Sequence, residues 1–306
     1  MENQGKNTVL LVAAFFAIYV IWGSTYLWNK IAVTELPPFM LAGVRFFTAG
    51  IIIFLIAIVL GKSLAITKQQ LLNTAFVGFL FLSLGNGLAV WALKYVDSGF
   101  AALEISAQPL VILLMMWILQ GKKIQPMSMI GVVLGMVGIY LLVGQKQLLS
   151  QENAVWGMLM IFVCMLSWGY GSLFVAKADL PKNYFVNTGY QMLSGGILLM
   201  VMSLLFRETW SNPLGWSFKT QAVMLLLVLF GSILAFTSFN YLLKSVSPEK
   251  VATSTYVNPI VALLLGWYFL DEEITLQSGV AAVILLTGVY FINTKKKLLL
   301  FRRFKR

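Results

Sequence analysis

The chain has 306 residues, of which 59% are hydrophobic and only 11% are charged. Soluble domains usually carry about 25% charged residues, so this composition excludes a water-soluble globule and leaves no room for a soluble catalytic domain. The net charge of +11 does not indicate nucleic acid, because seven of the 22 basic residues lie in the tail 295–306, just after the last apolar stretch. A basic segment in that position is typical of a cytoplasmic anchor against anionic lipid.

Apolar stretches long enough to cross a bilayer follow one another along the whole chain with short connections. A crossing takes roughly 20 apolar residues. We therefore predict an all-α integral membrane protein with ten transmembrane helices. Their expected ranges are 8–29, 38–60, 70–92, 98–120, 126–144, 154–176, 186–206, 219–243, 249–270 and 275–293.

The basic residues between these stretches predict the orientation. If the N-terminus is cytoplasmic, the inner segments carry sixteen Lys and Arg residues and the outer loops carry five. Cytoplasmic segments of membrane proteins are enriched in Lys and Arg. We expect a multi-pass protein of the bacterial cytoplasmic (inner) membrane with both termini in the cytoplasm.

The sequence nearly repeats itself. Trp22-Gly23 returns as Trp168-Gly169, at an offset of 146, and Pro109 returns as Pro259, at an offset of 150. Each copy holds five predicted spans, so the second copy must enter the membrane from the opposite side, which is typical of the inverted repeats of secondary transporters. We predict one repeat over 1–146, a second over 147–294, and a basic cytoplasmic tail over 295–306.

Two ionisable residues lie clearly inside predicted spans. Arg45 is expected about seven residues below the outer interface and Glu104 about six, so both would lie at a depth of about 10 Å. One interpretation makes Arg45 a clamp for an anion and Glu104 a site for a cation or a proton. The other is a static ion pair that holds the second and fourth spans together.

Polar side chains recur at related positions of the two copies. Glu104 and Gln108 are four residues apart and share a helix face, as do Ser254 and Asn258. The prolines that follow, Pro109 and Pro259, would free backbone carbonyls one turn earlier, and a broken helix beside polar groups is typical of a transporter site. The alternative is a kink that only shapes packing. Further candidates for substrate binding are Gln191, at the position of Arg45 in the second copy, together with Trp22, Asn86, Trp168, Tyr170 and Tyr256.

The chain has no histidine and a single cysteine, Cys164. Disulfides, histidine-bound metals and histidine-based acid–base catalysis are therefore excluded, and we expect no cofactor and no metal.

These features resemble the drug/metabolite transporter superfamily, and within it the EamA-type permeases. The resemblance covers essentially the whole chain. It rests on the Trp-Gly motif of the first and sixth spans, on Arg45-Phe46, and on two proline-bearing spans that each end in a charged loop, Gly121-Lys122-Lys123 and Asp271-Glu272-Glu273. The first loop departs from the family, which often has an acidic residue there. The resemblance implies a central cavity between two five-helix halves and the transport of small metabolites, often as export of amino acids or drugs.

We therefore expect a secondary transporter rather than an enzyme. It would move a small amino-acid-like or amphipathic compound by alternating access, more readily as an exporter, with proton coupling through Glu104 as one option and uncoupled exchange as the other. A membrane enzyme acting on lipid-linked substrates is the alternative from another class. Expected partners are the small-molecule substrate and membrane lipids, not nucleic acid, and a homodimer is left open.

Overall fold

The structure is a computed structural model, which describes residues 2–145, 152–246, 251 and 253–293. Within these residues all regular structure is helical, and nine helical stretches are long and apolar enough to cross a membrane. A tenth apolar helix, α15 (Ser254–Leu270), is described only from Ser254 onward. The predicted basic tail 295–306 lies outside the described residues.

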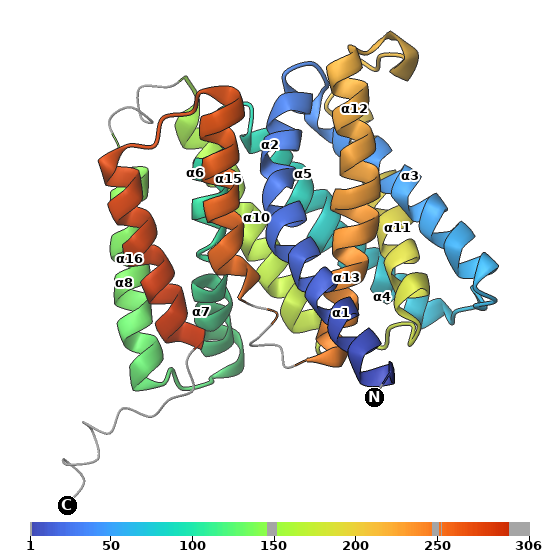
Figure 1. Cartoon of the computed structure of the whole chain (residues 1–306), viewed down its shortest axis with the longest axis horizontal. Helices are drawn as coiled ribbons and strands as arrows, with labels where there is room; N and C mark the ends of the chain where they lie inside the picture. Colours follow the sequence, from blue (N-terminus) through green and yellow to red (C-terminus); the bar gives the residue numbers. More distant parts are fainter. Residues whose placement is uncertain (1, 146–151, 247–250, 252, 294–306) are drawn as a thin grey trace, which may run out of the picture.

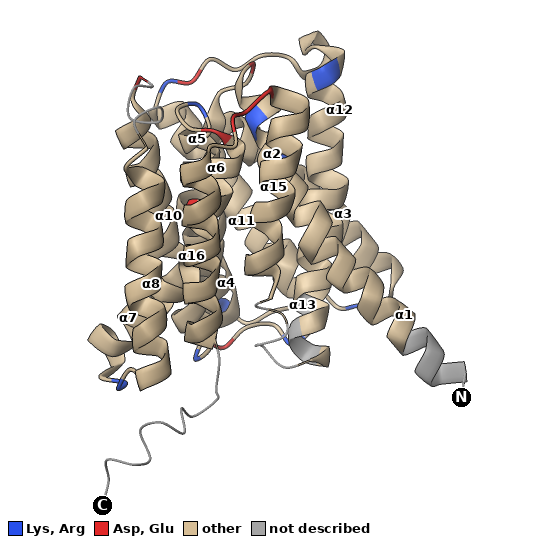
Figure 2. Cartoon of the chain, turned by 60° about the vertical axis from the view of Figure 1, so that its left-hand side comes forward, with Lys and Arg blue, Asp and Glu red and all other residues tan. Residues whose placement is uncertain are grey.

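The spans of the first half are α1 (Glu2–Phe16), η1 (Ala17–Ile21) and α2 (Trp22–Val33); α3 (Pro38–Val59); α4 (Lys68–Gly78), η2 (Phe79–Asn86) and α5 (Gly87–Ala92); α6 (Ser98–Ile105) and α7 (Gln108–Gln120); and α8 (Pro126–Val143). Those of the second half are α10 (Ala154–Val175); α11 (Tyr184–Leu205); α12 (Phe218–Leu226), η4 (Leu227–Leu234) and α13 (Ala235–Ser245); α15; and α16 (Leu276–Asn293). A short 3₁₀ turn, η3 (Pro213–Gly215), precedes α12. α1 begins and α16 ends at the same end of the bundle (Figures 1 and 2).

Equivalent helices of the two halves pack against each other. α3 lies against α11 at one edge of the bundle, and α8 lies against α16 at the opposite edge (Figure 1). Glycines permit the close approach: a Cβ on Gly196 would lie 2.6 Å from the backbone nitrogen of Phe47, and one on Gly131 would lie 2.5 Å from the carbonyl oxygen of Gly288. Small residues serve this purpose in membranes, where lipid is as apolar as the side chains and association depends on packing.

The backbone repeats along with the sequence. Gly61 (φ 65°) and Arg207 (φ 55°) are both left-handed, at the offset of 146. Gly121 (φ 63°) and Asp271 (φ 53°) are both left-handed, at the offset of 150. A left-handed residue after the last turn ends a helix, and glycine adopts it without strain. The second half keeps this geometry without glycine.

Two spans differ from the ranges that the sequence predicts. The first continues to Val33, so Lys30, expected in an outer loop, lies in α2 and its ammonium donates to the carbonyl oxygens of Leu93 and Val96, each at 2.8 Å. The fourth span is interrupted between α6 and α7, and Pro109 is the second residue of α7, where proline is tolerated. In contrast, Pro259 lies inside the uninterrupted helix α15.

Three spans contain wide helical turns. η1, η2 and η4 are π-helical, and η2 and η4 occupy equivalent spans of the two halves. π-helical turns inside α-helices occur frequently at functional sites. Two residues of η2, Gly85 and Asn86, and the residue just after η1, Trp22, line the cavity described next.

Candidate substrate cavity

A cavity of about 520 Å³ lies between the two halves. Its walls come from α2, η2, α5, α6, α7, α10, α13, α15 and α16. The lining reaches Phe239 and Asn293, toward the end of the bundle where α1 begins, and extends to Asn29 and Leu93 near the other end. A volume of this order is within the range of small-molecule sites.

Several residues predicted from the sequence line this cavity. Two tryptophans contribute rings: Trp168 stacks on Phe81 with centroids 4.6 Å apart, and Trp22 packs against Phe239 at 5.1 Å. The predicted residues that the structure brings together in the lining are Trp22, Asn86, Gln108, Pro109, Trp168, Ser254 and Asn258.

The two amides that precede the prolines make matching contacts across the halves. Gln108 donates from Nε2 to the carbonyl oxygen of Met165, at 3.0 Å. Asn258, with its amide oriented so that both of its polar atoms are satisfied, donates to the carbonyl oxygens of Ile18 and Tyr19 at 2.8 and 3.0 Å. Tyr19 and Met165 are themselves repeat-related, at the offset of 146. Each amide therefore ties a proline-bearing span to the first span of the other half.

Arg45 does not pair with Glu104 and does not line the cavity. Its side chain is 2% exposed and lies over the ring of Phe46 at 4.6 Å. Nε donates to Ser232 Oγ at 2.8 Å, and Nη1 donates to Asn29 Oδ1 at 3.3 Å. Asn29 does line the cavity, so its carboxamide is a link between the guanidinium of Arg45 and the cavity wall.

Glu104 is buried without a cation. It is 4% exposed, and its Oε2 has no hydrogen-bond partner among the described residues. Its helix, α6, packs against α10, which carries the cavity-lining residue Cys164. The Oδ1 of Asn86 is likewise buried without a partner. One of these buried oxygens belongs to a residue of the cavity lining, Asn86, and the other to Glu104, which is not in the lining although Ala101 and Ile105 of the same helix are. Buried polar groups of this kind are costly unless something bonds to them.

The remaining predicted residues lie elsewhere. Tyr170 is 44% exposed on the outside of α10, against Phe76. Gln191 is buried and donates to Asn187 Oδ1 at 3.2 Å. The hydroxyl of Tyr256 accepts from Asn293 Nδ2 at 3.1 Å, and Pro259 packs inside α15. None of these four residues lines the cavity.

The sequence analysis missed other polar residues of the lining. Asn29 had been assigned to the end of the first span, but α2 continues for another turn and carries Asn29 inside the bundle. The only signal in the sequence is an uncharged amide next to Lys30. The other lining residues with polar side chains that were missed are Thr25, Tyr26, Ser172, Thr255 and Asn293.

The cavity lining holds aromatic rings, amides and hydroxyls, and none of its described residues carries a charge. Over the described part of the chain, no three Cys, Asp or Glu side chains gather in a way that could hold a metal ion. The arrangement suits a ligand with an apolar body and a few hydrogen-bonding groups.

A family model described as the EamA-like transporter family matches residues 9–144 and 155–294. The chain is 33% identical over 295 residues to the "Uncharacterized inner membrane transporter YedA" of Escherichia coli (strain K12), covering 96% of this chain and 94% of that one. It is 24% identical to the "Uncharacterized transporter YoaV" of Bacillus subtilis (strain 168), over 94% of this chain and 97% of that one. One solved crystal structure has the same fold, with a TM-score of 0.65 and 20% identity over 98% of this chain and 99% of the other.

Proposed function

The chain belongs to the EamA-like transporter family, and from this premise we propose that it exports a small amino-acid-like metabolite by alternating access. The membrane is the bacterial cytoplasmic membrane, with both termini in the cytoplasm. The two family-matched segments are the halves that move against each other. Cytoplasmic termini put the loops after α2, α11 and α15 on the outer face.

The observation that carries the proposal is the chemistry of the cavity. Trp22, Trp168 and Phe239 offer an apolar, aromatic surface, whereas Asn86 in the lining and Glu104 on the adjoining helix α6 each carry a buried oxygen that lacks a hydrogen-bond donor. A substrate with a primary ammonium group on an apolar body has both an apolar surface for the aromatic rings and a hydrogen-bond donor for these oxygens. A site built to bond such a donor discriminates strongly against analogues that lack it, because its polar atoms are then left unpaired.

Arg45 and Glu104 have different roles in this proposal. Arg45 holds Oδ1 of Asn29 and directs the amide hydrogens of Asn29 toward a carboxylate or carbonyl of the substrate. Glu104 accepts the ammonium group or a proton, which makes coupling to a proton gradient one mode of operation and uncoupled exchange the other.

The cavity site is tested by two substitutions on one helix. Trp168→Ala removes a ring that lines the cavity, and Tyr170→Ala removes a ring of similar size that points away from it. In vesicles containing the purified protein, Trp168→Ala should raise the KM for aromatic and aliphatic amino acids by roughly tenfold or more, since it removes apolar contact worth ~1.5–3 kcal/mol. Tyr170→Ala should leave KM unchanged. Equal effects of the two substitutions would refute the cavity as the substrate site.

Substrate identity is tested by comparing the metabolites that leave cells with and without the protein. Excess release of compounds that bear a free amine supports the proposal, and release of only compounds without an amine contradicts it.

Proton coupling is tested with Glu104→Gln, in vesicles with and without a pH gradient. Coupling predicts that a pH gradient drives accumulation by the wild type but not by the variant, while exchange persists in both. If a pH gradient drives no accumulation by the wild type either, exchange is uncoupled, and Glu104 binds the substrate but not a transported proton.

A further inference from the structure

Three carboxylates close one end of the bundle. Glu35 follows α2, Glu208 follows α11 and Glu272 follows α15, and each binds the first residues of a helix in the other family-matched segment. Glu35 reaches from the first half to the second, and the other two reach from the second half to the first. We call these three contacts the carboxylate gate.

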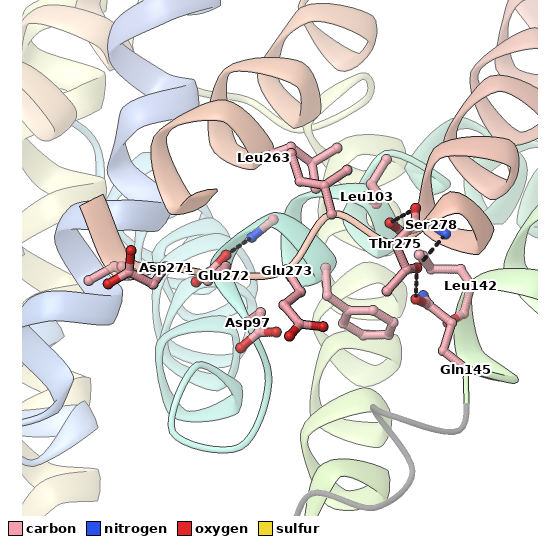
Figure 3. Close-up of a pocket in the computed structure, with 14 residues that line it drawn as sticks. Asp97, Leu103, Leu142, Gln145, Leu263, Asp271, Glu272, Glu273, Thr275 and Ser278 are labelled. Carbon is pink, nitrogen blue, oxygen red and sulfur yellow. Dashed lines mark hydrogen bonds between the residues drawn. The ribbon is translucent and has the colours of Figure 1, made fainter. Parts of the chain in front are cut away.

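Glu272 binds the N-terminus of α6. Its Oε1 accepts from the backbone nitrogen of Ser98 at 2.7 Å, and its Oε2 accepts from Ser98 Oγ at 2.9 Å and from the nitrogen of Gly99 at 3.0 Å. Figure 3 shows the Glu272 side chain with the last of these hydrogen bonds. The preceding residue, Asp97, makes no cap of its own. Gly266 makes room for the carboxylate, since a Cβ there would overlap Oε2 of Glu272.

Glu208 binds α3 in the same manner. Its two oxygens accept from the backbone nitrogens of Phe39 at 3.1 Å and Met40 at 2.8 Å. The N-cap position of α3 is Pro37, which has no side-chain acceptor. Helix N-termini carry unsatisfied N–H groups and a partial positive charge, so a carboxylate stabilises them.

Glu35 binds the start of α12. It accepts from the backbone nitrogen of Ser217 at 2.9 Å and from the Ser217 hydroxyl at 2.6 Å. The hydroxyl of Thr220 donates to the same carboxylate. Hydrogen bonds to a charged acceptor are about twice as strong as neutral ones.

At the opposite end of the bundle, α4 and α11 are capped by residues of their own half. Thr67 accepts from Gln70 at the start of α4, and Asn183 accepts from Phe185 at the start of α11. These two caps lie within one half. Across the halves at this end, Gln70 Nε2 donates to Asp179 Oδ1 at 3.1 Å and the Tyr190 hydroxyl donates to the carbonyl oxygen of Leu64 at 3.0 Å, and neither contact holds the backbone N–H groups of a helix start. The positions that are repeat-related to Glu35, Glu208 and Glu272 are Pro181, Lys62 and Lys122. The repeat therefore puts no carboxylate at the equivalent places.

The cavity reaches toward both ends of the bundle. Its lining includes Phe239 and Asn293 toward the end without the carboxylate gate, whereas Asn29 and Leu93 are its limit toward the gate. The three contacts across the halves exist only while the ends of α3, α6 and α12 stay next to the loops that hold the carboxylates. Separating the halves at this end breaks all three.

From this geometry we infer that Glu35, Glu208 and Glu272 form the gate that holds the outer end of the transporter closed and so favours the conformation open to the cytoplasm. The inference rests on the proposed function for the assignment of this end to the outside. Substituting a gate carboxylate should shift the population toward the outward-open conformation.

The test uses a cysteine reporter in the cavity. Ala89 lines the cavity on α5, close to the carboxylate gate. In the full-length protein, with Cys164→Ala as background, Ala89→Cys is labelled with a membrane-impermeant maleimide added to intact cells. Glu272→Gln should label about tenfold faster than the parent, and adding Glu208→Gln should raise the rate further. Glu152→Gln is the matched control, because Glu152 is exposed and has no assigned contact across the halves.

A second variant leaves all three carboxylates in place. Gly266→Ala should displace Glu272 and open the gate without removing a charge. Unchanged labelling in Glu272→Gln, Glu208→Gln and Gly266→Ala, in both cells and inside-out vesicles of protein that elutes as a folded monodisperse species, would overturn the gate. Faster labelling only in inside-out vesicles would keep the gate and refute the proposed orientation instead.

Discussion

The crossing of α8 and α16 offers a sharp test of the packing, through two glycines on the same helix. A Cβ on Gly288 would lie 2.7 Å from the backbone nitrogen of Gly135 and 2.9 Å from the carbonyl oxygen of Gly131. A Cβ on Gly279 would meet nothing within 4 Å. The two substitutions by alanine therefore gain the same helix propensity but differ in steric cost.

The magnitude follows from these distances. The distance of 2.7 Å from the new Cβ at position 288 to the nitrogen of Gly135 is about 0.7 Å shorter than an ordinary van der Waals contact. The atoms that it would meet belong to the backbone and cannot rotate away. Separating the helices should cost about 1–3 kcal/mol, against a gain of about 1 kcal/mol from replacing glycine in a helix. Gly279→Ala retains only the gain, so the two variants should differ by about 1–3 kcal/mol in free energy of unfolding.

The assay is reversible unfolding of the purified protein in mixed micelles, followed by the loss of helical circular dichroism as the denaturing detergent is increased. Wild type, Gly279→Ala and Gly288→Ala are compared in one series. If Gly288→Ala is as stable as Gly279→Ala, α8 and α16 do not cross at these glycines and the pairing of equivalent helices is wrong at this edge.

Three further outcomes are expected. Hydrogen bonds from the side chain of Ser217, from Thr220 and from the backbone of Ser217 lower the pKa of Glu35 below its ordinary 4.5. The stabilisation from these bonds is therefore present above the ordinary pKa and is lost as the pH falls through the lower pKa of the folded state. The difference in melting temperature between wild type and Glu35→Gln should stay constant down to roughly pH 5 and shrink below it. Arg207→Gly should stabilise the protein by about 1 kcal/mol in detergent unfolding, because it relieves a left-handed residue with φ 55°. Arg45→Lys should raise the KM of transport without unfolding the protein, because an ammonium lacks the fork that reaches two acceptors on different helices; an unchanged KM would contradict the role assigned to Arg45.

Much of the fold could be predicted from the sequence because the interior of the bilayer offers no hydrogen-bond partners to the backbone. Long apolar stretches must become helices there, since every backbone polar group has to be satisfied within its own segment. The repeat also predicted which residues correspond, and Gln108 and Asn258 do make corresponding hydrogen bonds to Met165 and Tyr19.

The candidate site was harder to predict. The position of a residue along a predicted span indicates its depth in the membrane, but it does not indicate which other helices that residue will contact. Arg45 and Glu104 were expected at equal depth, which allowed a mutual pair. Arg45 instead bonds to residues of α2 and η4, and Glu104 lies on α6, which packs against α10. Tyr170 was expected beside Trp168 in the pocket, but two residues along a helix turn it by about 200°, to the outside.

The sequence by itself determined the ten helices, the two related halves and the residues at which the halves differ in charge, because composition and periodicity act locally along the chain. Only the tertiary structure decided which of these residues meet. The carboxylate gate joins Glu272 to Ser98 across 174 positions and Glu208 to Met40 across 168. Such contacts depend on how whole helices dock, and no local pattern records that a loop carboxylate of one half will cap a helix of the other.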